Sequence, residues 1–231
     1  DYFNRLASRI TAALSVPTAA GPLYDVDTRL RPGGAKGMLV VSLEAFEQYQ
    51  RNEAWTWEHM ALCRARPVFG SEEVRAEVTA MIDGILRMPR DGAKVIADAA
   101  KMRDDIRRHK PPRSALDVKL GPGGLVDLEF ATHVLQLTTH VGLSTRLEEA
   151  LEALAAEGLV QANIVEALKL LSRMLVMMRL VAPEDVKPTR ETWQLVAEAC
   201  GAASWDALLA EHDAARQSIA ELWNSIKEGK R

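Results

Sequence analysis

The sequence predicts an α+β chain that is predominantly α, in which one β-hairpin is followed by a helical bundle. Charged and apolar residues alternate in one early segment, whereas apolar residues recur every three or four positions through most of the remainder. Proline and glycine separate these segments. The chain has 231 residues, of which 48% are hydrophobic and 26% charged, so it can bury a substantial core.

The first predicted elements are a helix and the hairpin. Residues 2–14 form a helix because their apolar side chains recur at helical spacing. Residues 23–32, LYDVDTRLRP, alternate and predict a strand. One face of that strand is charged and carries Asp25, Asp27, Arg29 and Arg31. Pro32-Gly33-Gly34 predicts a turn, and residues 37–42, GMLVVS, predict the second strand.

The pattern after the hairpin is helical. Ser42 caps a helix that continues or kinks through Arg66, and two further helices follow over 71–88 and 92–109. The breaker KPPR at 110–113 predicts a division into a first unit, 1–112, and a helical second unit, 113–231. The helices expected in the second unit cover 125–140, 145–157, 161–181, 189–199 and 204–227.

Composition narrows the range of partners. The net charge of -3 gives no reason to expect nucleic acid, and we expect no membrane span because Arg173 and Arg179 interrupt the apolar stretch at 170–181. Cys63 and Cys200 lack the spacing of a zinc site and are predicted to be reduced thiols. Residues 101–120 carry seven Lys or Arg against three Asp, a local basic patch that favours an anionic ligand.

The charged strand face is the strongest chemical signal. Four charges on one face are costly to bury without a metal ion or an anion. Carboxylates are ligands for Mg²⁺, and guanidinium groups match phosphate oxygens. The pattern therefore predicts a site for a magnesium-bound nucleoside triphosphate. A solvated strand face with cross-strand ion pairs is the alternative.

Three blocks of sequence resemble one protein family. They are residues 23–50, LYDVDTRLRPGGAKGMLVVSLEAFEQYQ, residues 52–66, NEAWTWEHMALCRAR, and residues 116–130, LDVKLGPGGLVDLEF. These blocks resemble the glutamine synthetase adenylyltransferases, bifunctional enzymes of bacterial nitrogen control. The wording NEAWTWEH is similar to the C-terminal half of the family, which attaches AMP rather than removing it.

The resemblance implies a cytoplasmic nucleotidyltransferase that moves AMP from ATP to a tyrosine hydroxyl of glutamine synthetase and so regulates nitrogen assimilation. Its implied partners are glutamine synthetase and the PII signalling protein, with ATP and glutamine as small-molecule ligands, and neither nucleic acid nor membrane. The hairpin would be part of a nucleotidyltransferase sheet. Phosphorolytic removal of AMP, and a regulatory module that binds a partner, are the alternatives.

The resemblance also assigns site residues. Asp27 matches a catalytic carboxylate that binds Mg²⁺, and Asp25 on the same face is a second candidate ligand. The residues expected to contact the nucleotide are Arg29, Arg31, Lys36, Gly37, Arg64 and Arg66. The family's upstream Gly-Ser and Asp-x-Asp elements do not occur here, so we expect a chain truncated at its N-terminal side and inactive alone. The general base is not identified.

Other conspicuous residues have structural interpretations. Trp57, Glu58, Arg64 and Arg66 are candidates to line the nucleotide or protein-substrate cleft, but Trp55 and Trp57 are expected first as packing anchors. His59 has no ligand partner at helical spacing and is expected to be structural. The glycines of GPGG at 121–124 precede a helix start that could bind an anion, but the block lacks a Walker-type lysine. We expect these glycines to permit close packing between domains.

Overall fold

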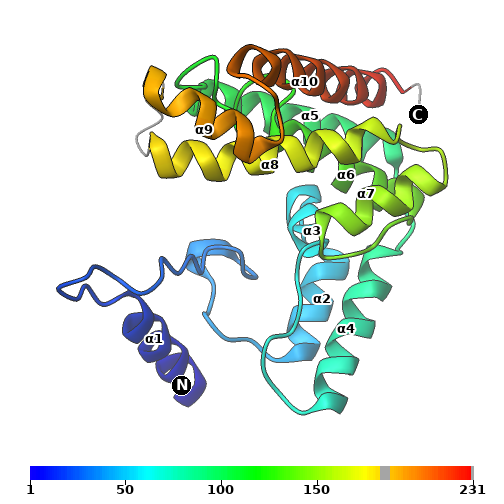
Figure 1. The fold of residues 1–231 in the computed structure, drawn as a ribbon. Coiled ribbons are helices and arrows are strands. Elements are labelled where there is room, and N and C mark those ends of the chain that lie inside the picture. The colour runs from blue at the N-terminus through cyan, green and yellow to red at the C-terminus, as the bar shows by residue number, and fades with distance from the viewer. Residues whose placement is uncertain (183–187, 230–231) are drawn as a thin grey trace. The chain divides into compact units, whose positions relative to one another are not determined.

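The computed structural model describes residues 1–182 and 188–229, and the regular structure within them is helical (Figure 1). It forms two compact units, Asp1–Ile85 and Leu86–Arg231, which are described separately. The predicted division at residues 112 and 113 lies inside the second unit and, as a domain division, stays a prediction. The elements are α1 (Tyr2–Ser15), a 3₁₀ turn η1 (Gly34–Lys36), α2 (Leu43–Asn52), α3 (Thr56–Leu62), α4 (Glu72–Leu86), α5 (Gly92–His109), α6 (Leu125–Thr139), α7 (Leu147–Ala156), α8 (Asn163–Val181), α9 (Arg190–Cys200) and α10 (Trp205–Lys227).

The predicted hairpin, and with it the partial nucleotidyltransferase sheet and the α+β class, is wrong for the described residues. Neither 23–32 nor 37–42 forms a strand, and the isolated β-bridge between Thr18 and Gly21 lies before both segments. Alternation predicts a two-faced strand, but a strand also needs a neighbour for its backbone groups, and an isolated hairpin is only marginally stable. The predominance of helix is confirmed.

In the segment 23–42, side chains rather than a neighbouring strand form hydrogen bonds with several backbone groups. The guanidinium group of Arg31 donates hydrogen bonds to the carbonyls of Ala35 and Gly37, both at 3.2 Å, and to the carbonyl of Thr28. The amide side chain of Asn4 on α1 accepts from the backbone N–H of Val40 at 3.0 Å. The segment is therefore an irregular loop fixed by polar contacts within itself and to α1.

The helices after this loop follow the predicted caps. The Ser42 hydroxyl accepts from the N–H of Ala45 at 3.2 Å, which begins α2 as expected. The predicted helix through Arg66 is interrupted after Asn52, and α3 restarts at Thr56. The Glu58 carboxylate caps the start of α3 by accepting a hydrogen bond from the N–H of Trp55 at 2.9 Å.

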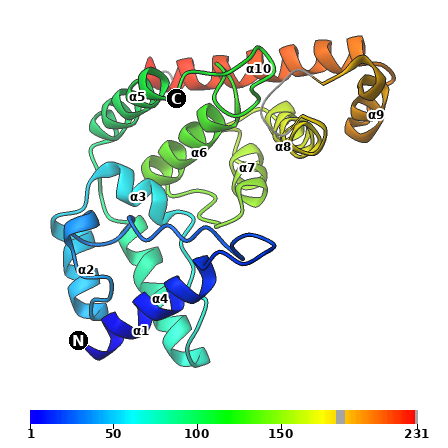
Figure 2. The same cartoon turned by 90° about the vertical axis from the view of Figure 1, so that its left-hand side faces the viewer.

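The second unit is built around α6. Helices α5, α7, α8 and α10 all contact it (Figure 2), and the buried α6 side chains include Leu128, Ala131, Val134 and Leu135. Helices α8, α9 and α10 also pack against one another. Cys200 on α9 and Cys63 in the first unit are both buried, and neither forms a disulfide, in agreement with the expected thiols.

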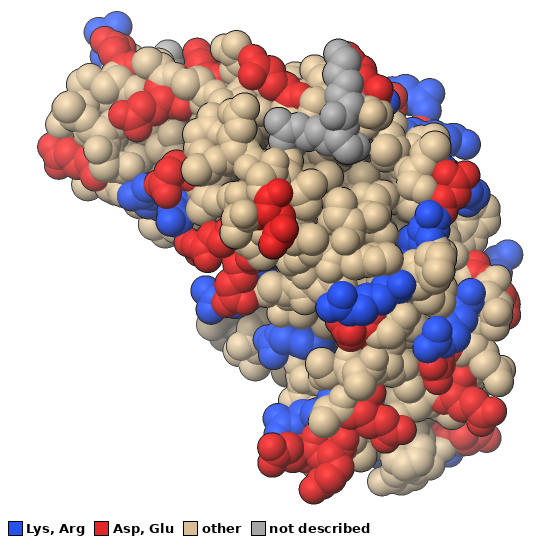
Figure 3. Space-filling view, turned by 90° about the vertical axis from the view of Figure 1, so that its right-hand side faces the viewer, with Lys and Arg blue, Asp and Glu red and all other residues tan. Residues whose placement is uncertain are grey.

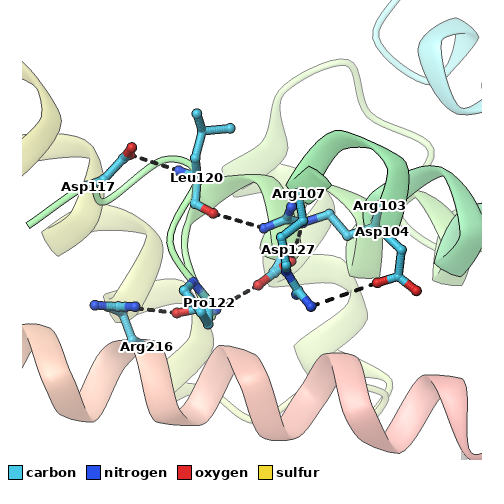
Figure 4. Close-up of polar contacts among 9 residues, drawn as sticks. Arg103, Asp104, Arg107, Asp117, Leu120, Pro122, Asp127 and Arg216 are labelled. Carbon is cyan, nitrogen blue, oxygen red and sulfur yellow. Dashed lines mark hydrogen bonds and ion pairs between the residues drawn. The ribbon is translucent and has the colours of Figure 1, made fainter. Parts of the chain in front are cut away.

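A buried ion pair holds the loop that precedes α6. Arg103 on α5 and Asp127 in the first turn of α6 lie with Nε and Oδ1 2.5 Å apart, and their side chains are 0% and 2% exposed (Figure 4). Arg103 also donates to the carbonyl of Leu120 at 3.1 Å, and Asp127 accepts from the N–H of Gly123 at 2.6 Å. The pair thus binds both neighbouring helices and the loop between them.

The glycines of GPGG allow helix α10 to approach this loop. A Cβ on Gly123, which has φ +69°, would lie 2.0 Å from the carbonyl oxygen of Arg216. The Arg216 guanidinium donates to the carbonyls of Pro122 and Ala115 at 2.8 and 3.0 Å. The glycines therefore serve packing, as expected, but their partner is a helix of the same unit.

We expect Arg103→Met to lower the free energy of unfolding by about 3–5 kcal/mol, because Asp127 would remain buried without its countercharge. The matched control is Arg107→Met on the same helix, whose exposed ion pair with Asp104 spans 3.8 Å and should contribute no more than about 1 kcal/mol. Urea unfolding followed by circular dichroism measures both. Equal losses in the two variants would contradict the assigned role of the buried pair.

We expect Gly123→Ala to destabilise the protein more than Gly158→Ala does. Both glycines have φ +69°, but a Cβ on Gly158 meets nothing within 4 Å. Gly158→Ala should therefore cost only the left-handed backbone penalty of about 1–2 kcal/mol, whereas Gly123→Ala adds a clash with backbone. Thermal unfolding of the two variants makes the comparison, and a smaller cost at Gly123 would refute it.

Candidate functional site

The loop 23–37 presents the residues that the sequence singled out most strongly. Asp27 and Arg29 form an ion pair, with Nη2 and Oδ2 2.6 Å apart, and both side chains are exposed. The backbone N–H of Arg29 donates to Oδ1 of the same carboxylate at 3.0 Å. Hydrogen bonds from the Arg29 side chain, followed by the one from its backbone, lower the pKa of Asp27 from 3.8 to about 2. Asp27 is therefore held as an oriented, ionised carboxylate.

The other predicted residues of this loop have distinct places. Asp25 is exposed beside the Asp27 pair. Lys36 is exposed on η1. Gly37 accepts from Arg31 through its carbonyl, so the Arg31 guanidinium organises the loop while keeping part of its donor capacity. Contacts of these residues with a nucleotide stay predictions.

A cavity of about 390 Å³ lies within the first unit, between this loop and helices α2 and α3. Most of its wall is apolar, with a polar portion formed by amide, carboxylate and guanidinium groups. The lining includes Leu30, Arg31, Phe46, Gln50, Glu58 and Arg64. It brings together two of the predicted nucleotide contacts, Arg31 and Arg64, and the predicted cleft residue Glu58. It does not include Asp25, Asp27, Arg29, Lys36, Gly37 or Arg66.

Glu58 is the buried charge of this cavity. Its side chain accepts from the Tyr49 hydroxyl, at 3.0 and 3.2 Å to its two oxygens, as well as from the Trp55 N–H. Burial, followed by the hydrogen bond with Glu58, raises the pKa of Tyr49, so the phenol remains a donor. Trp57 is 37% exposed, less than Trp55 at 70%, so neither indole is a buried anchor.

Sequence reasoning missed Gln50 and Tyr49. Gln50 lines the cavity and is 6% exposed, and its Oε1 is buried without a hydrogen-bond partner. The signal that pointed to it was its spacing of four from Phe46, which places both on one face of α2. His59 is structural, as expected: its Nε2 lies 2.8 Å from the backbone carbonyl of Gln50.

Neither a metal-binding cluster nor a membrane-spanning helix is found among the described residues. In residues 1–182 and 188–229, no three or more His, Cys, Asp or Glu side chains group together to hold a metal ion. In the same residues, no helix has the length and apolar character to cross a bilayer.

Part of the positive charge of the basic segment 101–120 is neutralised by nearby aspartates. Arg107 and Arg108 on α5 pair with Asp104 and Asp105 at a spacing of three residues. On the face drawn in Figure 3, basic side chains likewise lie among acidic ones. This pairing weakens the case for an anion site on α5.

We expect Arg29→Met to return the pKa of Asp27 towards 3.8, because the hydrogen bonds from the Arg29 side chain are the main cause of the shift. Because folding lowers the pKa of Asp27, the contribution of this ion pair to stability is fully present above about pH 3.8 and is lost as the pH falls through about 2. Carboxyl-detected NMR titration measures the value. Arg9→Met on α1 is the control and should leave it unchanged; a shift in both variants, or in neither, would contradict the assignment.

Two family models match the chain. The model described as "Glutamate-ammonia ligase adenylyltransferase" matches residues 1–81, which hold the loop and the cavity. The model described as "GlnD PII-uridylyltransferase" matches residues 97–226, more than half of the chain and almost all of the second unit.

Curated relatives agree with the first model. Bifunctional glutamine synthetase adenylyltransferase/adenylyl-removing enzymes are similar to this chain: that of Rhizobium meliloti is 44% identical over 88% of this chain and 22% of its own length. Those of Brucella suis and Agrobacterium fabrum are 45% and 50% identical over 74% and 67% of this chain, and over 19% and 16% of their own lengths. The chain thus spans about a fifth of the length of these relatives. It belongs to the glutamine synthetase adenylyltransferase family, with a second unit shared with the GlnD PII-uridylyltransferases.

Proposed function

We propose that this chain is part of an enzyme that transfers AMP from ATP to a tyrosine hydroxyl of glutamine synthetase, releasing pyrophosphate. The observation that carries the proposal is the 44% identity with a bifunctional glutamine synthetase adenylyltransferase over 88% of the chain. The matched region includes parts of two units, a first that contains the loop with the oriented Asp27 carboxylate and a second that is a helical bundle.

Asp27 is the residue that we assign to the reacting phosphates. A bound Mg²⁺ would neutralise charge on the phosphates and help to align the attacking hydroxyl with the leaving group. Asp27 would be one of its ligands, and Asp25 is the second candidate on the same loop. Arg29 orients the Asp27 carboxylate through its side chain and its backbone N–H.

The carboxylates of this loop do not make a complete magnesium site. Two-metal phosphoryl-transfer sites use several carboxylates, and the loop offers two. We therefore take the remaining ligands to be the family's Gly-Ser and Asp-x-Asp elements, and we expect the 231-residue chain alone to transfer no AMP. Detectable transfer by this chain alone would overturn that part of the proposal.

Removal of AMP is the second candidate activity, because the relatives' names give both activities. The wording NEAWTWEH at 52–59 favours attachment, through its resemblance to the C-terminal half of the family. The proposal further assigns the enzyme to the cytoplasm and to nitrogen regulation, with the PII protein and glutamine as regulators. A role for the helical bundle in docking one of these partners belongs to the same proposal.

Asp27→Asn tests the proposal in an enzyme of full family length that carries this chain. We expect the rate of AMP incorporation into glutamine synthetase to fall about 10²–10³-fold, since the carboxylate that faces the reacting phosphates loses its charge. The assay follows transfer of labelled AMP from ATP, with removal measured separately.

Arg29→Met is the matched control because it breaks the same ion pair but keeps the carboxylate. We expect a smaller loss than for Asp27→Asn and unchanged thermal stability in both. Selective loss of removal in Asp27→Asn would assign this loop to the removing activity, and full retention of both activities would exclude Asp27 from the site.

A further inference from the structure

The cavity of the first unit contains an unmet acceptor. Gln50 is 94% buried on α2, and its Oε1 has no hydrogen-bond partner although the side chain lines the cavity. A buried polar atom left without a partner costs free energy that a complementary donor would recover. An unmet amide oxygen at a cavity wall therefore indicates a ligand that brings an N–H or O–H group.

The surroundings of Gln50 restrict the shape of that ligand. Phe46, one helical turn before it, and Leu62 on α3 provide apolar walls, with Leu30 from the loop. Glu58 adds a second acceptor, but the Trp55 N–H and the single proton of the Tyr49 hydroxyl, which lies within reach of both carboxylate oxygens, already use part of its capacity. The cavity thus combines apolar walls with acceptors from Gln50 and Glu58 and with the guanidinium groups of Arg31 and Arg64.

We propose that this cavity receives the adenine base of ATP, with Gln50 Oε1 accepting a hydrogen bond from the 6-amino group. The inference rests on the proposed function, which makes ATP the substrate. Adenine presents two apolar faces and an exocyclic amine that can only donate, which matches this cavity. Arg64, exposed at its wall, adds positive charge towards the polyphosphate end of the nucleotide.

The backbone of Gln50 is held in place by a contact with α3. Its carbonyl contacts the Nε2 of His59 at 2.8 Å, and that ring is 9% exposed on α3. This contact joins α2 and α3, the two helices that line the cavity, at the residue that carries the side-chain amide. Gln50 is thus a specificity-determining residue on a fixed backbone.

The test compares ATP with purine riboside 5′-triphosphate, which lacks only the 6-amino group, in an enzyme of full family length that carries this chain. The wild type should prefer ATP about tenfold in kcat/KM, the effect of one hydrogen bond. Gln50→Leu should use both nucleotides about equally. Gln48→Leu, an exposed position two residues away on the same helix, should keep the preference.

Gln50→Leu should also keep or raise the Tm, because it removes an unmet buried acceptor and conserves volume. A preserved tenfold preference in Gln50→Leu, equal use of both nucleotides by the wild type, or equal use of GTP and ATP would each overturn base recognition by Gln50. Failure of the wild type to transfer AMP from ATP at all would instead refute the proposed function, and the inference with it.

Discussion

The second unit depends on one buried ion pair, that of Arg103 and Asp127. Both charges are removed from water, so each is met by the other and by a loop group, the carbonyl of Leu120 for Arg103 and the N–H of Gly123 for Asp127. This requirement fixes the loop between α5 and α6, and the fixed loop offers the carbonyls to which Arg216 of α10 attaches. The pair is therefore the point at which three helices of the bundle are joined.

The first unit is organised differently, and the difference bears on function. None of residues 1–49 is buried, so the loop that bears Asp27 depends on guanidinium hydrogen bonds rather than on a core. Segments of this kind belong to the less stable part of a protein, from which binding loops are drawn. The first buried residue along the chain is Gln50, at the wall of the cavity that we assign to the nucleotide base. In the function that we propose, chemistry at an adaptable loop is thus separated from base recognition at a firmer wall.

Much of the helical architecture could be predicted from the sequence, because helix periodicity and caps such as Ser42 are local signals. The hairpin could not, because alternation around Asp25 and Asp27 reports two faces but not whether another strand lies beside them. The sequence predicts Arg31 and Arg64 as nucleotide contacts, but the cavity that both residues line depends on the break between α2 and α3. Gln50 escaped notice because a neutral amide has no chemical signature until its burial and missing partner are known.

The most direct measurement of the central claim, that the first unit binds the nucleotide base, is photolabelling with 2-azido-ATP. The label would be applied to an enzyme of full family length that carries this chain, with excess ATP as competitor, and mapped by peptide mass spectrometry. The account predicts competable label on residues 43–66, which contain α2 and α3. Competable label confined to the helical bundle at 125–181, or to residues outside this chain, would contradict it.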